Sequence, residues 1–155
     1  MDDRTLMETA VQAREYSYSP YSNFRVGAAL LCADGSVYTG CNMENAAFTP
    51  GICAERTAIY KAVSEGKRNF LAIAIAGGPA AAGLGALSLT APCGVCRQVM
   101  REFCDPETFR IILGTGGEDL QSWLLKDLLP LSFGPENLAS GREPGEKKEK
   151  EVPGA

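Results

Sequence analysis

The sequence predicts a three-layer α/β/α domain with a mixed central sheet. Three observations support this fold class. Strand-like and helix-like segments alternate along the chain, an Asp-Gly hairpin adds an antiparallel strand pair, and 155 residues are enough to bury the core of one domain. We expect that domain to span residues 1–139. Residues 140–155 are rich in Gly, Lys, Glu and Pro and are expected to form a disordered tail, because they bury too little to offset their ordering entropy.

The N-terminal half is predicted to contain a helix, a β-hairpin and a second helix. In chain order, these elements cover residues 2–17, 24–32, 37–44 and 53–66. The first helix carries apolar side chains at helical spacing, such as Leu6 and Ala13, and a loop at 19–23 ends it. The first strand alternates apolar side chains on one face, and Asp34-Gly35 suits the positive φ angles of a type I′ hairpin turn. The second helix has an apolar face and stops at a glycine.

The C-terminal half is predicted to add two strands and two helices. In chain order, they cover residues 70–76, 92–103, 109–113 and 124–129. The strand at 70–76 is wholly apolar, as expected of a central strand that is covered on both faces. A Gly/Ala-rich loop at 77–91 separates it from the next helix, which Pro92 opens, and Pro130 stops the last short helix.

The composition argues against several functional classes. The chain has 15 basic and 19 acidic residues, and this net charge of −4 makes it a poor electrostatic partner for a polynucleotide. No apolar run approaches the roughly 18 residues of a membrane span, and the first residues lack the pattern of a secretory signal. We therefore expect a cytoplasmic protein with no membrane and no polynucleotide partner. In that reducing compartment, six cysteines favour metal binding over disulfides.

Three cysteines and a glutamate form two motifs that predict a zinc site. Cys53 is followed two residues later by Glu55, and Cys93 and Cys96 form a Pro-Cys-x-x-Cys motif. The chain has no histidine, so a zinc site here needs sulfur or carboxylate ligands. Three thiolates leave the fourth tetrahedral position for water, as in catalytic zinc sites. Both motifs begin predicted helices, whose positive N-terminal ends favour the thiolate form.

Glu55 and Arg56 each have a chemical and a structural interpretation. Beside a catalytic water, Glu55 is a general acid and base, whereas alone it is a solvated first-turn residue that suits the helix dipole. Three thiolates on Zn²⁺ leave one net negative charge, which weakens the power of the metal to acidify water. Arg56 is therefore predicted to donate hydrogen bonds to the thiolates, and the alternative is a surface arginine.

Other roles for the cysteines stay open at this stage. Cys93 and Cys96 alone also suit a redox pair. Together with Cys53 they also suit a closed structural site, which one further cysteine would complete. The remaining cysteines are otherwise expected to pack in the core, and they are Cys32, Cys41 and Cys104.

Asn42 and Glu44 predict a polar substrate-binding edge. They are two residues apart on the predicted strand at 37–44, so their side chains face the same side. They also directly precede the loop that leads to Cys53. An amide and a carboxylate at a cleft are well suited to sugar hydroxyls, and the alternative is a pair of half-exposed polar strand residues.

With these residues in place, the chain resembles the cytidine deaminases, in particular the small homotetrameric class with a three-cysteine zinc site. A Cys-x-Glu motif followed by Pro-Cys-x-x-Cys is the layout of zinc deaminases. The resemblance covers about residues 5–138. The segments that carry it are 18–29, 40–47, 53–56, 92–98 and 128–133.

The resemblance implies a role for each motif. The three motif cysteines hold Zn²⁺, and Glu55 shuttles protons. The residues implied for substrate binding are Phe24, Asn42, Glu44, Ala54 and Phe133. Among these, Asn42 and Glu44 bind the ribose, and Phe24 packs against the pyrimidine. Phe133 reaches into the site of a neighbouring subunit, so that the homotetramer shares its sites; without the resemblance, core packing is the simpler interpretation of both phenylalanines.

The implied reaction is hydrolytic deamination of the free nucleosides cytidine and deoxycytidine, in pyrimidine salvage. Water activated by zinc attacks C4, while Glu55 takes its proton, protonates N3 and helps ammonia to leave. One alternative is a zinc deaminase for blasticidin S, adenine, guanine or a polynucleotide, and the other is a non-catalytic zinc scaffold. The segment 42–45 argues against blasticidin S, the acidic charge and short length against a polynucleotide, and Glu55 against a scaffold.

Three features depart from the family pattern. Phe48 stands where many relatives carry tyrosine, which removes a hydroxyl from the predicted substrate loop. The loop at 77–91 is longer and richer in Gly and Ala than is usual, and residues 140–155 extend the chain. None of these features touches the metal motifs.

Overall fold

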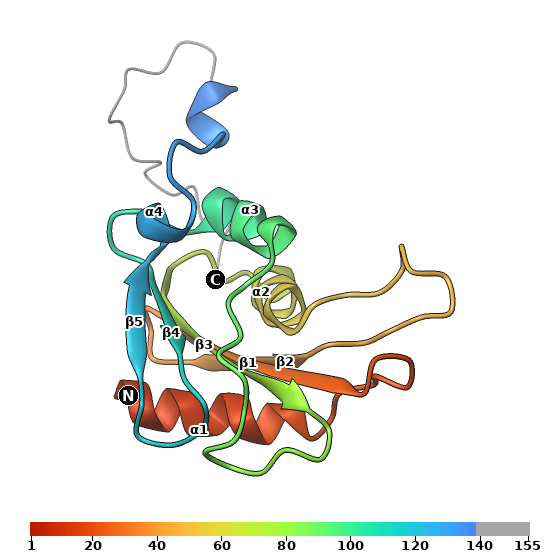
Figure 1. The fold of residues 1–155 in the computed structure, drawn as a ribbon. Coiled ribbons are helices and arrows are strands. Elements are labelled where there is room, and N and C mark those ends of the chain that lie inside the picture. Colours follow the sequence, from red (N-terminus) through yellow and green to blue (C-terminus); the bar gives the residue numbers. More distant parts are fainter. Residues whose placement is uncertain (139–155) are drawn as a thin grey trace.

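The computed structural model describes residues 1–138, so the tail expected at 140–155 lies outside the described residues. The elements in chain order are α1 (Asp3–Arg14), β1 (Phe24–Cys32), β2 (Val37–Cys41), α2 (Ala54–Ser64), β3 (Phe70–Pro79), α3 (Gly94–Phe103), β4 (Arg110–Leu113), β5 (Gln121–Leu124), α4 (Leu125–Leu128) and a 3-10 turn (Pro135–Asn137). The sheet carries α1 on one face and α2 and α3 on the other (Figure 1). The predicted three-layer α/β/α class is confirmed. No helix within residues 1–138 is long and apolar enough to cross a membrane.

The order of the strands determines where α2 and α3, the two helices on the same face of the sheet, begin. The sheet runs β2-β1-β3-β4-β5, and β3 and β4 are its parallel neighbours. Because β1 is antiparallel to both β2 and β3, the strands β2, β3 and β4 all point the same way. The chain therefore crosses the sheet twice in the same direction, through α2 and then through α3. Crossovers of one hand put both helices on one face, with their N-termini at the carboxyl edge of the parallel strands.

Alternate side chains of β1 build the core on both faces of the sheet. Ala28 and Leu30 point into the cluster under α2 and α3, whereas Ala29 and Leu31 point into the cluster under α1. This alternation is the one predicted for the strand from its sequence. The predicted β3 is buried along most of its length, as its wholly apolar sequence indicated.

Three elements differ from their predicted form. Strand β3 continues to Pro79, past the predicted end at residue 76, because residues 77–79 stay paired with β1. The strand predicted at 37–44 ends at Cys41, because the next residues pair with Tyr18. The N–H of Tyr18 donates to Asn42 O at 3.0 Å, and the N–H of Glu44 donates to Tyr18 O at 2.8 Å. The short strand β5 was not predicted. Its four residues, Gln121–Leu124, are mostly exposed and do not alternate in polarity, so they carry no strand signal.

Glycines let both helical layers approach the sheet closely. A Cβ on Gly27 of β1 would lie 2.1 Å from Ala10 O in α1, and a Cβ on Gly40 of β2 would lie 2.4 Å from Ala54 O in α2. Neither distance is compatible with a side chain. The first turn of α2, which carries Glu55, is thus seated directly on the edge strand.

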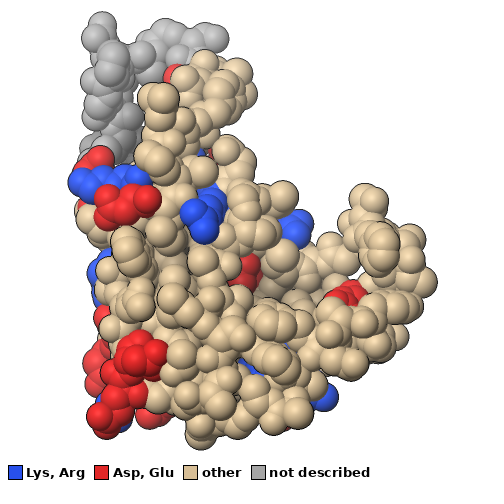
Figure 2. Space-filling view, in the orientation of Figure 1, with Lys and Arg blue, Asp and Glu red and all other residues tan. Residues whose placement is uncertain are grey.

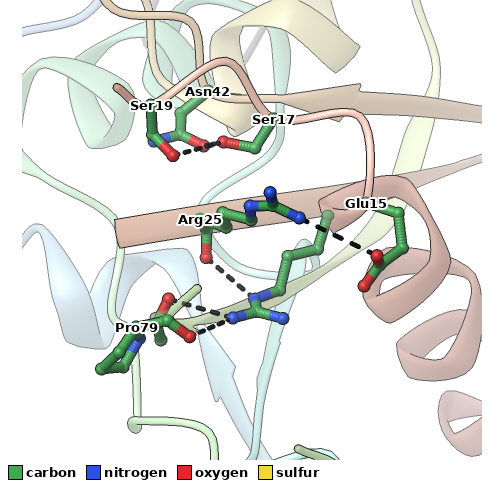
Figure 3. Close-up of polar contacts among 8 residues, drawn as sticks. Glu15, Ser17, Ser19, Arg25, Asn42 and Pro79 are labelled. Atoms are coloured by element: carbon green, nitrogen blue, oxygen red, sulfur yellow. Dashed lines mark hydrogen bonds and ion pairs between the residues drawn. The ribbon is translucent and has the colours of Figure 1, made fainter. Parts of the chain in front are cut away.

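Arg14 ties the end of α1 to the sheet. Its side chain is buried, and its guanidinium donates to three backbone carbonyls: Arg25 O at 3.1 Å, Gly78 O at 3.1 Å and Pro79 O at 2.5 Å (Figure 3). Burial lowers the pKa of Arg14. The three carbonyls belong to the paired ends of β1 and β3, so Arg14 secures the part of the ladder from which the loop at 80–91 departs.

We expect Gly40→Ala to destabilise the protein by about 1–3 kcal/mol, because the added methyl group overpacks the contact between β2 and α2. Thermal unfolding measures this as a drop in Tm of roughly 2–4 °C per kcal/mol. The control is Gly83→Ala, since a Cβ at Gly83 meets nothing within 4 Å. Equal melting temperatures for the two variants would contradict the close approach of α2.

Candidate active site

The three motif cysteines converge at the starts of two helices. Cys53 is the N-cap residue of α2, Cys93 is the N-cap residue of α3, and Cys96 lies in the first turn of α3. Their Sγ atoms all lie within 4.8 Å of one another, and those of Cys53 and Cys93 are 3.6 Å apart. Cys96 is buried and Cys93 is exposed. Residues 40 positions apart in the chain thus form one sulfur cluster.

This cluster fits a tetrahedral metal with one open position. Zinc bound by thiolates at about 2.3 Å places neighbouring sulfurs about 3.8 Å apart, close to the spacing seen here. Within residues 1–138, Cys32, Cys41 and Cys104 lie outside the cluster. A closed site with a fourth cysteine is therefore not formed by the described residues. The donor set of three soft thiolates suits zinc.

Hydrogen bonds within the cluster give its thiols different pKa values. The pKa of Cys53 is lowered to about 5, because Cys96 donates a hydrogen bond to its sulfur, and Arg56 and Cys93 add further hydrogen bonds. The pKa of Cys96 is raised by the same contact with Cys53 and by burial. Metal binding at this cluster must therefore displace protons, as it does at thiolate sites in general.

Arg56 contacts the cluster as predicted. Its Nη2 donates to Cys53 Sγ at 3.4 Å, and this contact raises the pKa of Arg56. Its Nε is buried and has no hydrogen-bond partner among the described residues. These contacts favour the predicted interpretation over that of a solvated surface arginine. The guanidinium brings positive charge next to a site that three thiolates make negative.

Glu55 is buried beside the cluster. Only 3% of its surface is exposed, and burial raises its pKa to about 7, with a further contribution from the negative charge on Cys53. The interpretation of Glu55 as a solvated first-turn residue is therefore wrong. A carboxyl group with a pKa near neutrality is well placed to accept and to donate protons.

A cavity of about 440 Å³ opens onto the sulfur cluster. The loop between β2 and α2 projects from the body of the molecule (Figure 1), and the space-filling view shows a hollow between this loop and the body (Figure 2). The residues that line the cavity are Tyr21, Val26, Asn42, Met43, Glu44, Asn45, Phe48, Gly51, Ile52, Cys53, Ala54, Glu55, Arg56, Thr90, Ala91 and Cys93. Both predicted polar residues, two of the cysteines and Glu55 thus share one cavity.

Most of the polar groups of Asn42 already have partners. Its Oδ1 accepts hydrogen bonds from the Ser17 hydroxyl (Figure 3) and from Val26 N–H at 2.8 Å. Its Nδ2 donates to Phe24 O at 2.9 Å. A carboxamide has two acceptor lone pairs and two N–H groups. One N–H of Asn42 is therefore left for a ligand.

Glu44 is held in a similar way. Its Oε1 accepts from the N–H groups of Tyr21 at 3.0 Å and Ser22 at 3.1 Å. The Ser22 side chain contributes most to lowering the pKa of Glu44, and these two N–H groups lower it further. The carboxylate therefore stays ionised. Its second oxygen, Oε2, has no hydrogen-bond partner within residues 1–138 and is left to accept from a ligand.

The predicted aromatic residues lie outside the cavity. Phe24 does not line it, whereas Val26, which shares a face of β1 with Phe24, does. Phe133 is 58% exposed, and its backbone is held against α3, because Gln98 Nε2 donates to Phe133 O at 2.9 Å. Ala54 does line the cavity. The period-two pattern of β1 was the signal that could have added Val26 to the predicted residues.

Sequence reasoning missed Arg97, which supports the cluster from behind. Its Nε donates to Pro92 O at 2.7 Å and its Nη1 donates to Leu128 O at 2.6 Å. Arg97 thus ties the turn before Cys93 to the end of α4. In the sequence, only the position of Arg97 directly after Cys96 indicates that it contributes to the site.

Known proteins match this chain over most of its length. The family model described as "Cytidine and deoxycytidylate deaminase zinc-binding region" matches residues 1–112. A cytidine deaminase of Halalkalibacterium halodurans is 46% identical over 138 residues, which are 89% of this chain and 98% of that protein. A cytidine deaminase of Sporosarcina psychrophila is 42% identical over 146 residues, which are 92% and 99% of the two chains.

Solved structures give the same result. The crystal structure of cytidine deaminase from Burkholderia pseudomallei aligns with a TM-score of 0.76 at 44% identity, covering 86% of this chain and 100% of the other. The crystal structure of cytidine deaminase from Mycobacterium tuberculosis aligns with a TM-score of 0.72 at 37% identity, covering 86% and 98%. The residues matched by the family model, 1–112, include the three cysteines of the cluster and Glu55.

We expect the purified protein to hold one zinc ion per chain and Cys96→Ser to lose most of it, because two thiolates hold the metal far more weakly than three. Elemental analysis after dialysis against a weak chelator measures the loss. Cys104→Ala is the matched control, since Cys104 lies at the other end of α3 and outside the cluster. Full zinc content in Cys96→Ser would contradict the assignment of the cluster as the metal site.

Proposed function

This chain belongs to the cytidine and deoxycytidylate deaminase family, and we propose that Cys53, Cys93 and Cys96 hold its zinc while Glu55 moves the protons of hydrolytic cytidine deamination. One observation carries this assignment of roles. A buried carboxyl group, two thiols of the three-cysteine cluster and two partly used polar side chains face the same cavity.

The chemistry is divided between the metal and the chain. Bound zinc supplies the Lewis acidity that activates water for attack on C4 of the pyrimidine. Glu55 takes a proton from that water and passes it to N3. It then takes the second proton, from the new C4 hydroxyl, and passes it to the departing amino group, so that cytidine and water give uridine and ammonia. Its burial supports this role, because a carboxyl group with a pKa near 7 exchanges protons readily in both directions.

Asn42 and Glu44 select the sugar. The remaining N–H of Asn42 donates to a ribose hydroxyl, and Oε2 of Glu44 accepts from one. Both side chains are otherwise fully engaged, so a substrate without its hydroxyl groups would leave them unpaired. Deoxycytidine is a second substrate. Ala54 contacts the substrate at the start of α2. Phe24 packs near the pyrimidine from β1, on the same face of the strand as Val26, which lines the cavity.

The assembly is a homotetramer in which Phe133 completes the site of a neighbouring subunit. Its exposed ring supports this assignment, since a phenylalanine that is 58% exposed has no role in the core of its own chain. Leu131, at the same segment, is fully exposed with a positive φ of 48°, which makes the segment project.

The substrate is a free nucleoside, and the role is pyrimidine salvage in the cytoplasm. Lys and Arg are scattered over the face that contains the hollow (Figure 2), without the stripe that a polynucleotide requires. The cavity lining includes Glu44 and Glu55 against a single cation, Arg56, whose charge is directed at Cys53. A polyanion gains little at such a surface.

We expect Glu55→Gln to lower kcat for cytidine by about 10²–10⁴-fold with zinc content unchanged, because the amide fills the same space but carries no titratable proton. The fall in ultraviolet absorbance on loss of the amino group measures turnover, and blasticidin S is assayed in parallel. Glu65→Gln is the matched control at the far end of α2. Deamination of blasticidin S but not of cytidine by the wild type would refute the proposed substrate.

We expect Arg56→Gln to lower kcat/KM by roughly 10–100-fold while most of the zinc stays bound, because uncompensated thiolates reduce the acidity of the metal site. Arg68→Gln is the control, since Arg68 donates only to backbone carbonyls at the end of α2. Unchanged turnover in Arg56→Gln would contradict the hypothesis that this arginine compensates the charge of the thiolates.

A further inference from the structure

One short segment, residues 17–22, holds both of the side chains assigned to the ribose. Its backbone pairs with the chain on either side of Met43, through Tyr18 N–H to Asn42 O and Glu44 N–H to Tyr18 O. Its next residues donate two backbone N–H groups to the Glu44 carboxylate. The geometry of the sugar contacts is therefore set by this segment as well as by the strand that precedes Asn42.

Ser17 is the member of the segment that reaches the Asn42 side chain. Its half-buried hydroxyl lies between two acceptors, Asn42 Oδ1 and Ser19 Oγ, the latter at 3.3 Å (Figure 3). A hydroxyl has one proton, and the contact with Asn42 is the closer of the two. Ser17 does not line the cavity, so it touches no substrate there.

The contacts around Asn42 leave its carboxamide one orientation. Val26 N–H and the Ser17 hydroxyl both donate to Oδ1, and Phe24 O accepts from Nδ2. A flipped amide would set Nδ2 against Val26 N–H and Oδ1 against Phe24 O, so that like groups would face each other. The hydrogen bond from Ser17 also polarises the amide and thereby strengthens the donor capacity of its remaining N–H.

We propose that Ser17 is a positioning residue for sugar recognition, which acts through Asn42 by saturating its carbonyl oxygen and presenting its free N–H to the ribose. This inference rests on the proposed ribose contact of Asn42. Without the Ser17 hydroxyl, one lone pair of Oδ1 loses its partner in a half-buried place, and the remaining N–H of Asn42 loses the polarisation that this hydrogen bond supplies.

The test compares two substrates that differ only in their sugar hydroxyls, cytidine and 2′,3′-dideoxycytidine. We expect Ser17→Ala to lower kcat/KM for cytidine about tenfold, mainly through KM, and to change kcat/KM for the dideoxy substrate less than about twofold. The loss should thus depend on the presence of the hydroxyls, which is the mark of a coupled pair. Ser64→Ala, at the far end of α2, is the matched serine control and should leave both substrates unaffected.

The outcomes separate this inference from the function on which it rests. If the wild-type enzyme processed both substrates equally, the result would contradict the proposed sugar contact itself. A wild-type preference for cytidine that Ser17→Ala leaves intact, with equal losses on both substrates, would show a general structural role for Ser17 and would overturn the inference alone. An unchanged kcat/KM for cytidine in Ser17→Ala would overturn it as well.

Discussion

The active site depends on two helices that begin at the same edge of one sheet. The strands β2, β3 and β4 point the same way, and the chain crosses from the first to the second and from the second to the third in the same direction. Connections of one hand then place α2 and α3 on one face, with their N-termini together. Cys53 and Cys93 are the N-cap residues of these helices, so the topology alone brings the sulfur ligands within reach of one metal ion.

Charge balance is the second constraint on this site. Three thiolates in a small volume repel one another, and the chain supplies positive potential from two helix N-termini and from Arg56. The same compact arrangement buries Glu55, and burial raises its pKa to about 7. The close contact of α2 with Gly40 contributes both to the positive potential at the cluster and to the burial of Glu55, because it seats the first turn of the helix directly on the sheet.

The side of the cavity that we propose binds the sugar follows a different principle, in which polar side chains are held by backbone groups. Asn42 and Glu44 each spend most of their hydrogen-bonding capacity on the protein and keep one donor or acceptor for a ligand. Such side chains lose little conformational entropy on binding, and they discriminate strongly because an absent hydroxyl leaves them unpaired. Arg14 supports this side from behind by securing the ends of β1 and β3.

The sequence by itself determined the layer architecture, the helix starts and the candidate metal ligands, because periodicity, turn residues and cysteine spacing are local signals. It also placed Asn42 and Glu44 near the site. Only the tertiary structure decided that 42–44 leave the strand to pair with Tyr18, that β5 completes the sheet, and that Glu55 is buried. The same holds for Ser17 and Arg97, whose partners lie 25 and 31 residues away in the chain. Contacts of this kind arise from the way the elements pack, and a single sequence contains no local pattern that records them.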